Sequence, residues 1–150
     1  MAHIDIFIGT VFGGAEAVAE ALNDELISNG HTVSLHNPGT IAEVQGSSNI
    51  IICTSTTGTG DIPDGLVELY FELKESFPLI PETSFAVVGL GDSSYGATFC
   101  YAGFRFDELL EELTGKRVME YFRIDAMETF EPEEDALVWL KDYMQQLDKL

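Results

Sequence analysis

Three short stretches of the sequence are rich in glycine and hydroxyl residues, and each directly follows a run of apolar residues. They are residues 9–16 (GTVFGGAE), 54–64 (TSTTGTGDIPD) and 89–100 (GLGDSSYGATFC). Main-chain groups in such turns can bind an anion or the edge of a flat ligand, because glycine permits close approach and tolerates positive φ. The three stretches therefore predict a binding site built largely from backbone.

The first stretch lies between a predicted strand and a predicted helix, a position that suits a phosphate. A helix N-terminus carries unpaired N–H groups and a partial positive charge. Gly9 and Gly14 have the spacing of a Walker loop, but Ala15 and Glu16 stand where Lys and Ser/Thr belong. The stretch is not GxGxxG either, and an ordinary strand-to-helix connection remains the alternative.

The second and third stretches fit a planar ligand. Residues 54–64 follow a buried apolar run, and their glycines allow a ring to come close to the backbone. In residues 89–100, Tyr95 offers an aromatic face for stacking. The alternatives are a flexible surface turn for the second stretch and an ordinary amphipathic surface residue for Tyr95.

The charge balance limits the possible partners. The chain has 7 basic and 26 acidic residues, for a formal net charge of -19. Such a field repels phosphates, so we expect neither nucleic acid nor a membrane surface as a partner, whereas a basic protein fits; the alternative is that the charge serves solubility alone. Every Lys and Arg follows residue 73, so backbone must hold any anion bound by the first stretch.

Cysteine and histidine spacing gives no sign of a metal site. Cys53 and Cys100 lie far apart with no CxxC pair, which favours buried, reduced thiols. His3, His31 and His36 lack the spacing of metal ligands, so we expect solvated or hydrogen-bonded histidines and no metal.

Two other functional classes fit poorly. Residues 91–93 (GDS) look like the opening of an esterase motif, but no histidine follows His36 to activate the serine. A receiver-type signalling domain needs an acid pair after the first strand, where this chain has Gly9 and Thr10, and no acid closes the third strand before Thr54.

The elements that position these stretches alternate along the chain. Strands are predicted over residues 4–8, 31–35, 49–55, 85–90 and 117–124, and helices over residues 15–26, 65–77, 104–113 and 133–147. The alternation predicts an α/β fold in which helices cover both faces of a five-stranded parallel sheet, within one domain over residues 1–150. Ligands then bind beyond the carboxyl ends of the strands. No apolar run approaches the ~20 residues that cross a bilayer, so we expect a cytoplasmic protein, and we expect a monomer.

Together, these loops resemble those of the flavodoxin family, in the same order and over essentially the whole chain. The match is closest to its small branch that includes MioC-like proteins, and TTGxGD and LGDSSY also look like flavin loops of diflavin reductases. The resemblance implies a flavodoxin-like doubly wound three-layer sandwich with strand order 2-1-3-4-5. It also implies FMN as cofactor, with the phosphate on residues 10–15 and the isoalloxazine ring between the second and third loops.

The resemblance carries over residue by residue. The residues implied to bind FMN are Thr10, Val11, Phe12, Gly13, Gly14, Ala15, Thr56, Thr57, Gly58, Thr59, Gly60, Gly91, Asp92, Ser93, Ser94, Tyr95 and Phe99. Tyr95 matches the aromatic residue on the outer face of the ring, and the Gly58 peptide matches the one that accepts the N5 hydrogen of the half-reduced ring. Asp92, Ser93 and Ser94 would offer backbone groups to the pyrimidine edge.

Some positions depart from the family pattern. Val11, Phe12 and Ala15 replace common hydroxyl residues, which leaves backbone and the Thr10 hydroxyl for the phosphate. Thr57 stands where many relatives place Trp or Tyr on the inner face of the ring, and one extra residue separates Tyr95 from Phe99.

The function implied is that of a low-potential, one-electron carrier between a flavodoxin reductase-like donor and an acceptor protein, both basic; a non-enzymatic carrier is favoured over an enzyme, and the enzyme question stays open. Asp61, Asp64 and Asp92 could steer such partners, whereas the helix dipole alone accounts for the acids of residues 131–135. The alternative is a flavodoxin-fold binding or regulatory protein in which FMN binding is weak or lost.

Overall fold

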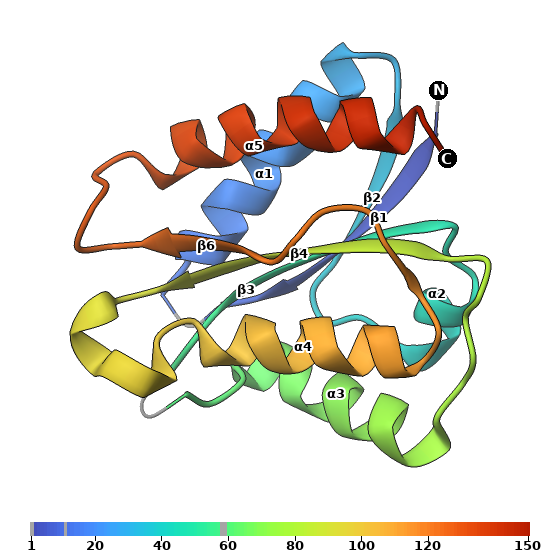
Figure 1. The fold of residues 1–150 in the computed structure, drawn as a ribbon, viewed down its shortest axis with the longest axis horizontal. Coiled ribbons are helices and arrows are strands. Elements are labelled where there is room, and N and C mark those ends of the chain that lie inside the picture. Colours follow the sequence, from blue (N-terminus) through green and yellow to red (C-terminus); the bar gives the residue numbers. More distant parts are fainter. Residues whose placement is uncertain (1, 11, 58–59) are drawn as a thin grey trace.

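The computed structural model describes residues 2–10, 12–57 and 60–150 (Figure 1). The strands are β1 (His3–Gly9), β2 (Thr32–His36), β3 (Asn49–Ser55), β4 (Ser84–Gly91), β5 (Lys116–Arg117) and β6 (Phe122–Asp125). The helices are α1 (Gly14–Ser28), α2 (Ile41–Gln45), α3 (Asp64–Ser76), the 3-10 helix η1 (Ser93–Thr98), α4 (Tyr101–Glu112) and α5 (Pro132–Leu147). Within the described residues, no helix is long and apolar enough to span a membrane.

All strand pairs in the sheet are parallel, in the order β2-β1-β3-β4-β5, with β6 also paired to β4. Helices α1 and α5 cover one face of the sheet, and α3 and α4 cover the other (Figure 1). This arrangement confirms the predicted three-layer flavodoxin-like fold and its strand order 2-1-3-4-5.

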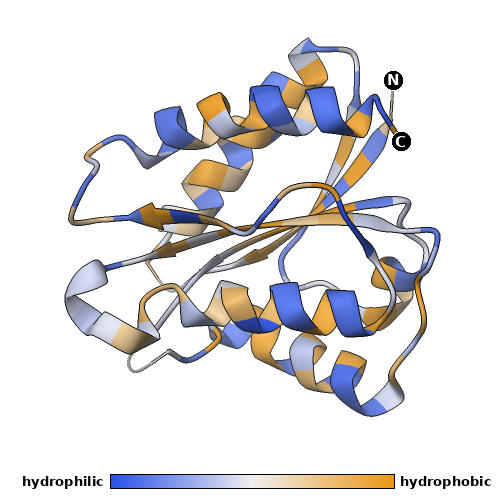
Figure 2. Cartoon of the chain, in the orientation of Figure 1, coloured by the Kyte–Doolittle hydropathy of each residue, from blue (hydrophilic) through white to orange (hydrophobic). Residues whose placement is uncertain are grey.

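The core forms two layers, because the central strands are apolar on both faces (Figure 2). In β1, Ile4, Ile6 and Ile8 pack with α1 and α5, whereas Phe7 belongs to the opposite layer beneath α3 and α4. All four side chains are at most 2% exposed. Burial on both faces explains why this strand reads as an almost unbroken apolar run.

The fifth strand differs from its prediction as one continuous element. β5 pairs Arg117 with Phe85, and β6 pairs Phe122 with Val88. From Phe85 to Val88 the chain of β4 advances three residues, whereas the facing chain advances five, from Arg117 to Phe122. Two extra residues therefore form a bulge between β5 and β6. A bulge of this kind redirects side chains that regular pairing would point elsewhere.

Two short helices, α2 and η1, were absent from the prediction. α2 begins with a capping box, in which the Thr40 side chain accepts from the Glu43 amide and the Glu43 carboxylate accepts from the Thr40 amide. Asp92 caps η1 in a related way by accepting from the Ser94 amide. The Thr-x-x-Glu pattern was a readable signal for α2.

Candidate functional site

The three loops singled out in the sequence meet at the carboxyl edge of the sheet, where they enclose two adjoining cavities. The larger, of about 540 Å³, is lined by Thr10, Phe12, Gly14, Ser55, Thr56, Thr57, Pro63, Asp64 and Tyr95. The smaller, of about 230 Å³, is lined by Ser55, Thr56, Leu90, Gly91, Asp92, Tyr95, Thr98, Phe99, Cys100 and Ala126. Ser55, Thr56 and Tyr95 line both, so the cavities adjoin and form one elongated site.

The first loop brings the N-terminus of α1 to the larger cavity. Gly13 precedes the helix with φ +88°, a left-handed conformation that favours glycine, and its N–H donates to Thr10 Oγ1 over 2.8 Å. No side chain of the described residues caps α1. Since the first N–H groups of a helix have no intrahelical acceptor, the amides of residues 14–16 remain available to an anion.

The second loop is closed by its own backbone. The Thr57 and Asp61 main chains exchange hydrogen bonds of 3.0 and 2.8 Å, and the Gly60 amide also donates to the Thr57 carbonyl. Thr56 Oγ1 accepts from the Ala102 amide over 3.2 Å and thereby ties this loop to the start of α4. Gly60 has φ +101°, and a Cβ there would press on Tyr101 and Thr98 at about 3.2–3.3 Å, so glycine is required.

The third loop already engages two of its amides. Ser93 donates to Asp125 Oδ1 over 3.0 Å, and Ser94 donates to Asp92 Oδ1 over 2.8 Å. Neither serine lines a cavity. Tyr95, in contrast, is 61% exposed and stands between the two cavities, where its ring can stack on a planar ligand.

A fourth segment, formed by the last residue of β6 and the residue after it, supports the third loop and is not among the predicted site residues. Asp125 Oδ1 accepts from the amides of Ser93 and Met127, and these hydrogen bonds hold the pKa of its carboxyl below the usual value. The Ala126 amide donates to the Gly91 carbonyl over 2.8 Å. Its position after a parallel strand was the available signal, because all such ends share one edge of the sheet.

The wall of the smaller cavity depends on close packing between β4 and the start of α4. A Cβ at Gly91 would lie 2.9 Å from both the amide nitrogen and the sulfur of Cys100. Cys100 is fully buried, and burial raises the pKa of its thiol to about 12. The thiol therefore stays protonated and uncharged, as does that of buried Cys53, whose pKa burial also raises to about 12.

The structure brings together most, but not all, of the predicted site residues. Those that line a cavity are Thr10, Phe12, Gly14, Thr56, Thr57, Gly91, Asp92, Tyr95 and Phe99. Ala15 is buried in the core, so only its backbone can serve the site. Val11, Gly58 and Thr59 lie outside the described residues.

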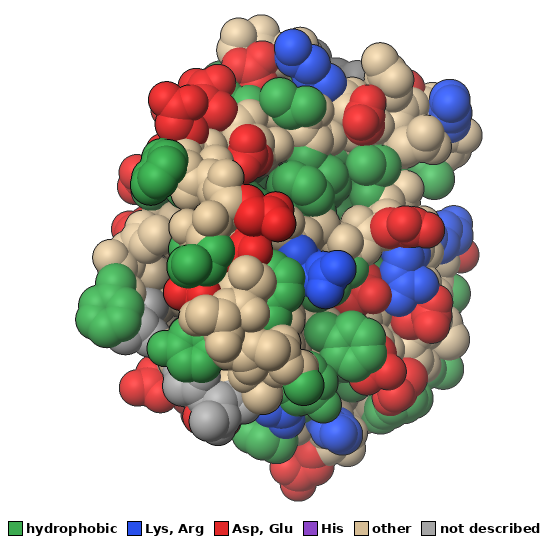
Figure 3. Space-filling model, turned by 60° about the vertical axis from the view of Figure 1, so that its left-hand side comes forward, with side chains coloured by type: hydrophobic (Ala, Val, Ile, Leu, Met, Phe, Trp, Pro, Cys, Tyr) green, Lys and Arg blue, Asp and Glu red, His purple; other side chains and the backbone are tan. Residues whose placement is uncertain are grey.

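The site is acidic. Asp64 lines the larger cavity and Asp92 the smaller, and no Lys or Arg is among the described residues that line them. Figure 3, with this side of the molecule turned forward, shows acidic, hydrophobic and some basic side chains interspersed over the surface. In the described part of the chain, no group of His, Cys, Asp and Glu is arranged to hold a metal ion.

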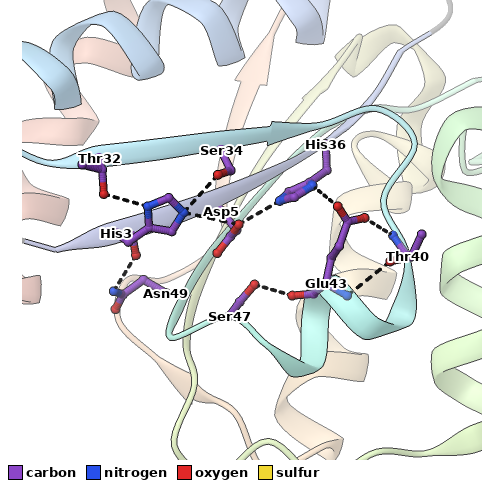
Figure 4. A network of polar contacts seen from close by, with 9 residues as sticks. All are labelled: His3, Asp5, Thr32, Ser34, His36, Thr40, Glu43, Ser47 and Asn49. Carbon is purple, nitrogen blue, oxygen red and sulfur yellow. Dashed lines mark hydrogen bonds and ion pairs between the residues drawn. The ribbon is translucent and has the colours of Figure 1, made fainter.

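A second polar assembly, the β1–β2 polar cluster, joins His3 and Asp5 on β1 to the side chains of β2 and α2 (Figure 4). His36 contacts Asp5 through Nε2 at 2.8 Å and Glu43 through Nδ1 at 2.7 Å. The His3 ring contacts the hydroxyls of Thr32 and Ser34 at 2.7 and 3.1 Å.

These polar groups are satisfied by one another. His36 also stacks on Phe7, with ring centroids 4.6 Å apart. Burial acts to raise the pKa of Glu43, but its hydrogen bonds with Thr40 and the neighbouring His36 hold it below the usual value.

The fold and site define a doubly wound α/β protein with a loop-lined ligand site at the carboxyl edge of its sheet. The flavodoxin family model matches residues 6–139, and the chain belongs to the flavodoxin family. The chain is 37% identical to flavodoxin YqcA of Escherichia coli strain K12 over 145 residues, which cover 95% of this chain and 97% of that protein. It is 36% identical to a MioC homologue of Haemophilus influenzae, over 97% of this chain and 99% of that protein.

A solved structure agrees with the sequence comparison. A cysteine-to-serine mutant of flavodoxin from Pseudomonas aeruginosa superposes with a TM-score of 0.90 at 36% identity, over 97% of this chain and 99% of that one. These relatives confirm the resemblance to flavodoxins and MioC-like proteins. Membership of the family implies flavin binding and the chemistry of an electron carrier.

Proposed function

We propose that the protein binds FMN along the two adjoining cavities and carries single electrons between a reductase-like donor and an acceptor protein. The observation that carries this proposal is the continuity of the site from the uncapped N-terminus of α1 to Gly91, past the exposed ring of Tyr95. Both cavity volumes together suit a mononucleotide-sized ligand with one polar end and one flat end.

The residues present fit the phosphate without a cationic side chain. The free amides of residues 14–16 can donate hydrogen bonds to an anion, and the dipole of α1 attracts negative charge to the same end of the helix. Because Thr10 Oγ1 already accepts from Gly13, its hydroxyl hydrogen is free to be donated to a phosphate oxygen. Backbone and one hydroxyl together provide the donor set.

The ring end fits an aromatic, redox-active group. Tyr95 covers the outer face, and the small Thr57 side chain leaves the inner face open. Ser93 and Ser94 shape the pocket indirectly, since their amides are engaged by Asp125 and Asp92. When bound, FMN supplies reversible one-electron chemistry, and the carboxylates of Asp64 and Asp92 disfavour additional negative charge on it, which lowers its reduction potential.

The electron partners follow from charge. With a net charge of -19 and acidic residues on both cavities, the protein attracts basic partners and repels acidic ones. Rates of reduction by a basic reductase should therefore fall as salt is added. Rates that stay constant with ionic strength would contradict electrostatic steering.

Flavin titration tests the proposal directly. When FMN is titrated into apoprotein, the flavin fluorescence should be quenched until one equivalent has been added. Riboflavin, which lacks the phosphate, should bind at least about tenfold more weakly. A redox titration of the complex should resolve two one-electron steps. Equal affinity for FMN and riboflavin would contradict the phosphate site at α1.

A second function is favoured by one feature of the first loop. Phe12 is 98% exposed at the rim of the larger cavity, a position suited to contact with a protein partner. If the apoprotein shows no binding of FMN in the titration, that result would support a flavodoxin-fold binding or regulatory protein.

A further inference from the structure

Tyr121 packs behind the wall of the smaller cavity: it does not line that cavity itself, but it bonds to Cys100, which does. Tyr121 lies in the bulge between β5 and β6, so the direction of its side chain does not follow the alternation of a regular strand. Its phenol oxygen enters a slot between Gly89 of β4 and Gly103 of α4, where a Cβ on either glycine would overlap it. Any larger residue at either position would displace this ring.

The hydroxyl of Tyr121 makes one specific bond inside the slot. It donates to the carbonyl oxygen of Cys100 over 2.5 Å. Cys100 is the residue before α4 and has φ +55°, a left-handed conformation that is uncommon for residues other than glycine. The same carbonyl accepts a longer hydrogen bond, of 3.3 Å, from the Phe104 amide of α4, so the Tyr121 hydroxyl provides the shorter of the two bonds that fix the peptide after Cys100.

This peptide belongs to the wall of the proposed flavin site. Cys100 lines the smaller cavity and packs directly on Gly91, and the Ala102 amide just beyond it donates to Thr56 Oγ1. A change at the Cys100 carbonyl would therefore reach the third loop through Gly91 and the second loop through Thr56. Both loops line the same cavity.

We propose that Tyr121 is a positioning residue that holds the wall of the flavin pocket in its binding conformation through the Cys100 carbonyl. This inference rests on the proposed function, because it concerns the pocket in which FMN binds. When only a fraction of the molecules has the binding-competent conformation, the apparent dissociation constant rises to the intrinsic value divided by that fraction. Loss of the Tyr121 hydroxyl thus weakens FMN binding without removing any group that touches FMN.

The variant Tyr121→Phe tests this role, since it keeps the ring in the slot and removes only the donor. We expect its FMN dissociation constant to rise about tenfold. The visible circular dichroism of the bound flavin and its reduction potential should also change, because both report on the pocket wall and not on global stability. Thermal unfolding of the apoprotein provides the comparison.

Tyr143→Phe is the matched control. The Tyr143 hydroxyl is also buried, on α5 in the opposite core layer, and has no hydrogen-bond partner among the described residues. Its removal should leave FMN affinity and the flavin spectrum unchanged. Tyr121→Phe with a lower thermal midpoint but wild-type affinity, circular dichroism and potential would overturn the positioning role.

Gly103→Ala tests the same contact from the other side, because its Cβ would overlap the Tyr121 phenol oxygen. It should also weaken FMN binding, and it decides the question if Tyr121→Phe does not fold. Failure of the wild-type protein to bind FMN would contradict the proposed function. Wild-type binding with unaltered binding by Tyr121→Phe and Gly103→Ala would contradict only the role of Tyr121.

Discussion

The carboxyl-edge site and the β1–β2 polar cluster use polar groups in opposite ways. In the cluster, His36 faces carboxylates through both ring nitrogens, and Asp5 is only 9% exposed. At the site, the amides of residues 14–16 have no helical acceptor and no side-chain cap among the described residues. The cluster satisfies its own polar groups, whereas the site leaves donors for a ligand.

The difference shows how to separate stability from binding in this protein. A buried polar group that loses its partner costs stability, because it can no longer be solvated. A hydrogen-bond donor that faces solvent in the free protein costs little stability, and it contributes to the free energy of binding once a ligand accepts from it. Substitutions in the two regions should therefore change different measurements.

Asp5→Ala should have the largest effect, on the free energy of unfolding. It removes the acceptor at 2.8 Å from His36 Nε2 and leaves a partly buried ring nitrogen without that partner. We expect a loss of about 2–3 kcal/mol in urea denaturation, with the FMN dissociation constant unchanged. Asp24→Ala, at an exposed carboxylate of α1, is the control; equal stability of the two variants would break the contrast.

Tyr95→Ala should show the converse pattern. The ring is 61% exposed, so its removal leaves urea denaturation of the apoprotein nearly unchanged. Loss of one stacking face should raise the FMN dissociation constant about tenfold. Tyr95→Phe, which keeps the face, should bind almost as the wild type does, and an equal loss in both variants would argue against stacking.

Thr10→Val should have a smaller effect that depends on the phosphate. It removes the hydroxyl that accepts from Gly13 and could donate to a phosphate oxygen. FMN affinity should fall about fivefold, while riboflavin affinity should stay constant. Thr10→Ser should restore FMN affinity; parallel losses for both ligands would show that the residue shapes the loop and does not contact phosphate.

The smallest effect should come from Asp125 and depend on pH. Hydrogen bonds from Ser93 lower the pKa of its carboxyl, so its contribution to stability is present above the unfolded pKa and is lost as pH falls through the folded pKa. Unfolding of the wild type and Asp125→Asn, compared from pH 7 to pH 3, should differ at neutral pH and converge below 3.8, the ordinary value. A difference that grows toward acid would contradict this linkage.

The sequence predicted regular elements better than their connections. The predicted bounds of α1 and α5 lie within a few residues of the observed ones, because the apolar residues of each helix repeat at helical spacing. α2 was missed although its capping box is local, and the bulge in the fifth strand was missed because its register depends on β4. Of the site, the three loops were predicted, whereas the segment around Asp125 and Ala126 was not.

Local pattern alone determined the alternation of strands and helices, the glycine-rich loops after the strands and the absence of basic residues from the first half of the chain. Those features depend on neighbours in sequence. Only the tertiary structure decided that Ser93 donates to Asp125, that Tyr121 enters a slot between two glycines, and that His36 lies between Asp5 and Glu43. Each of these contacts joins separate elements, and their geometry follows from how the sheet and helices pack.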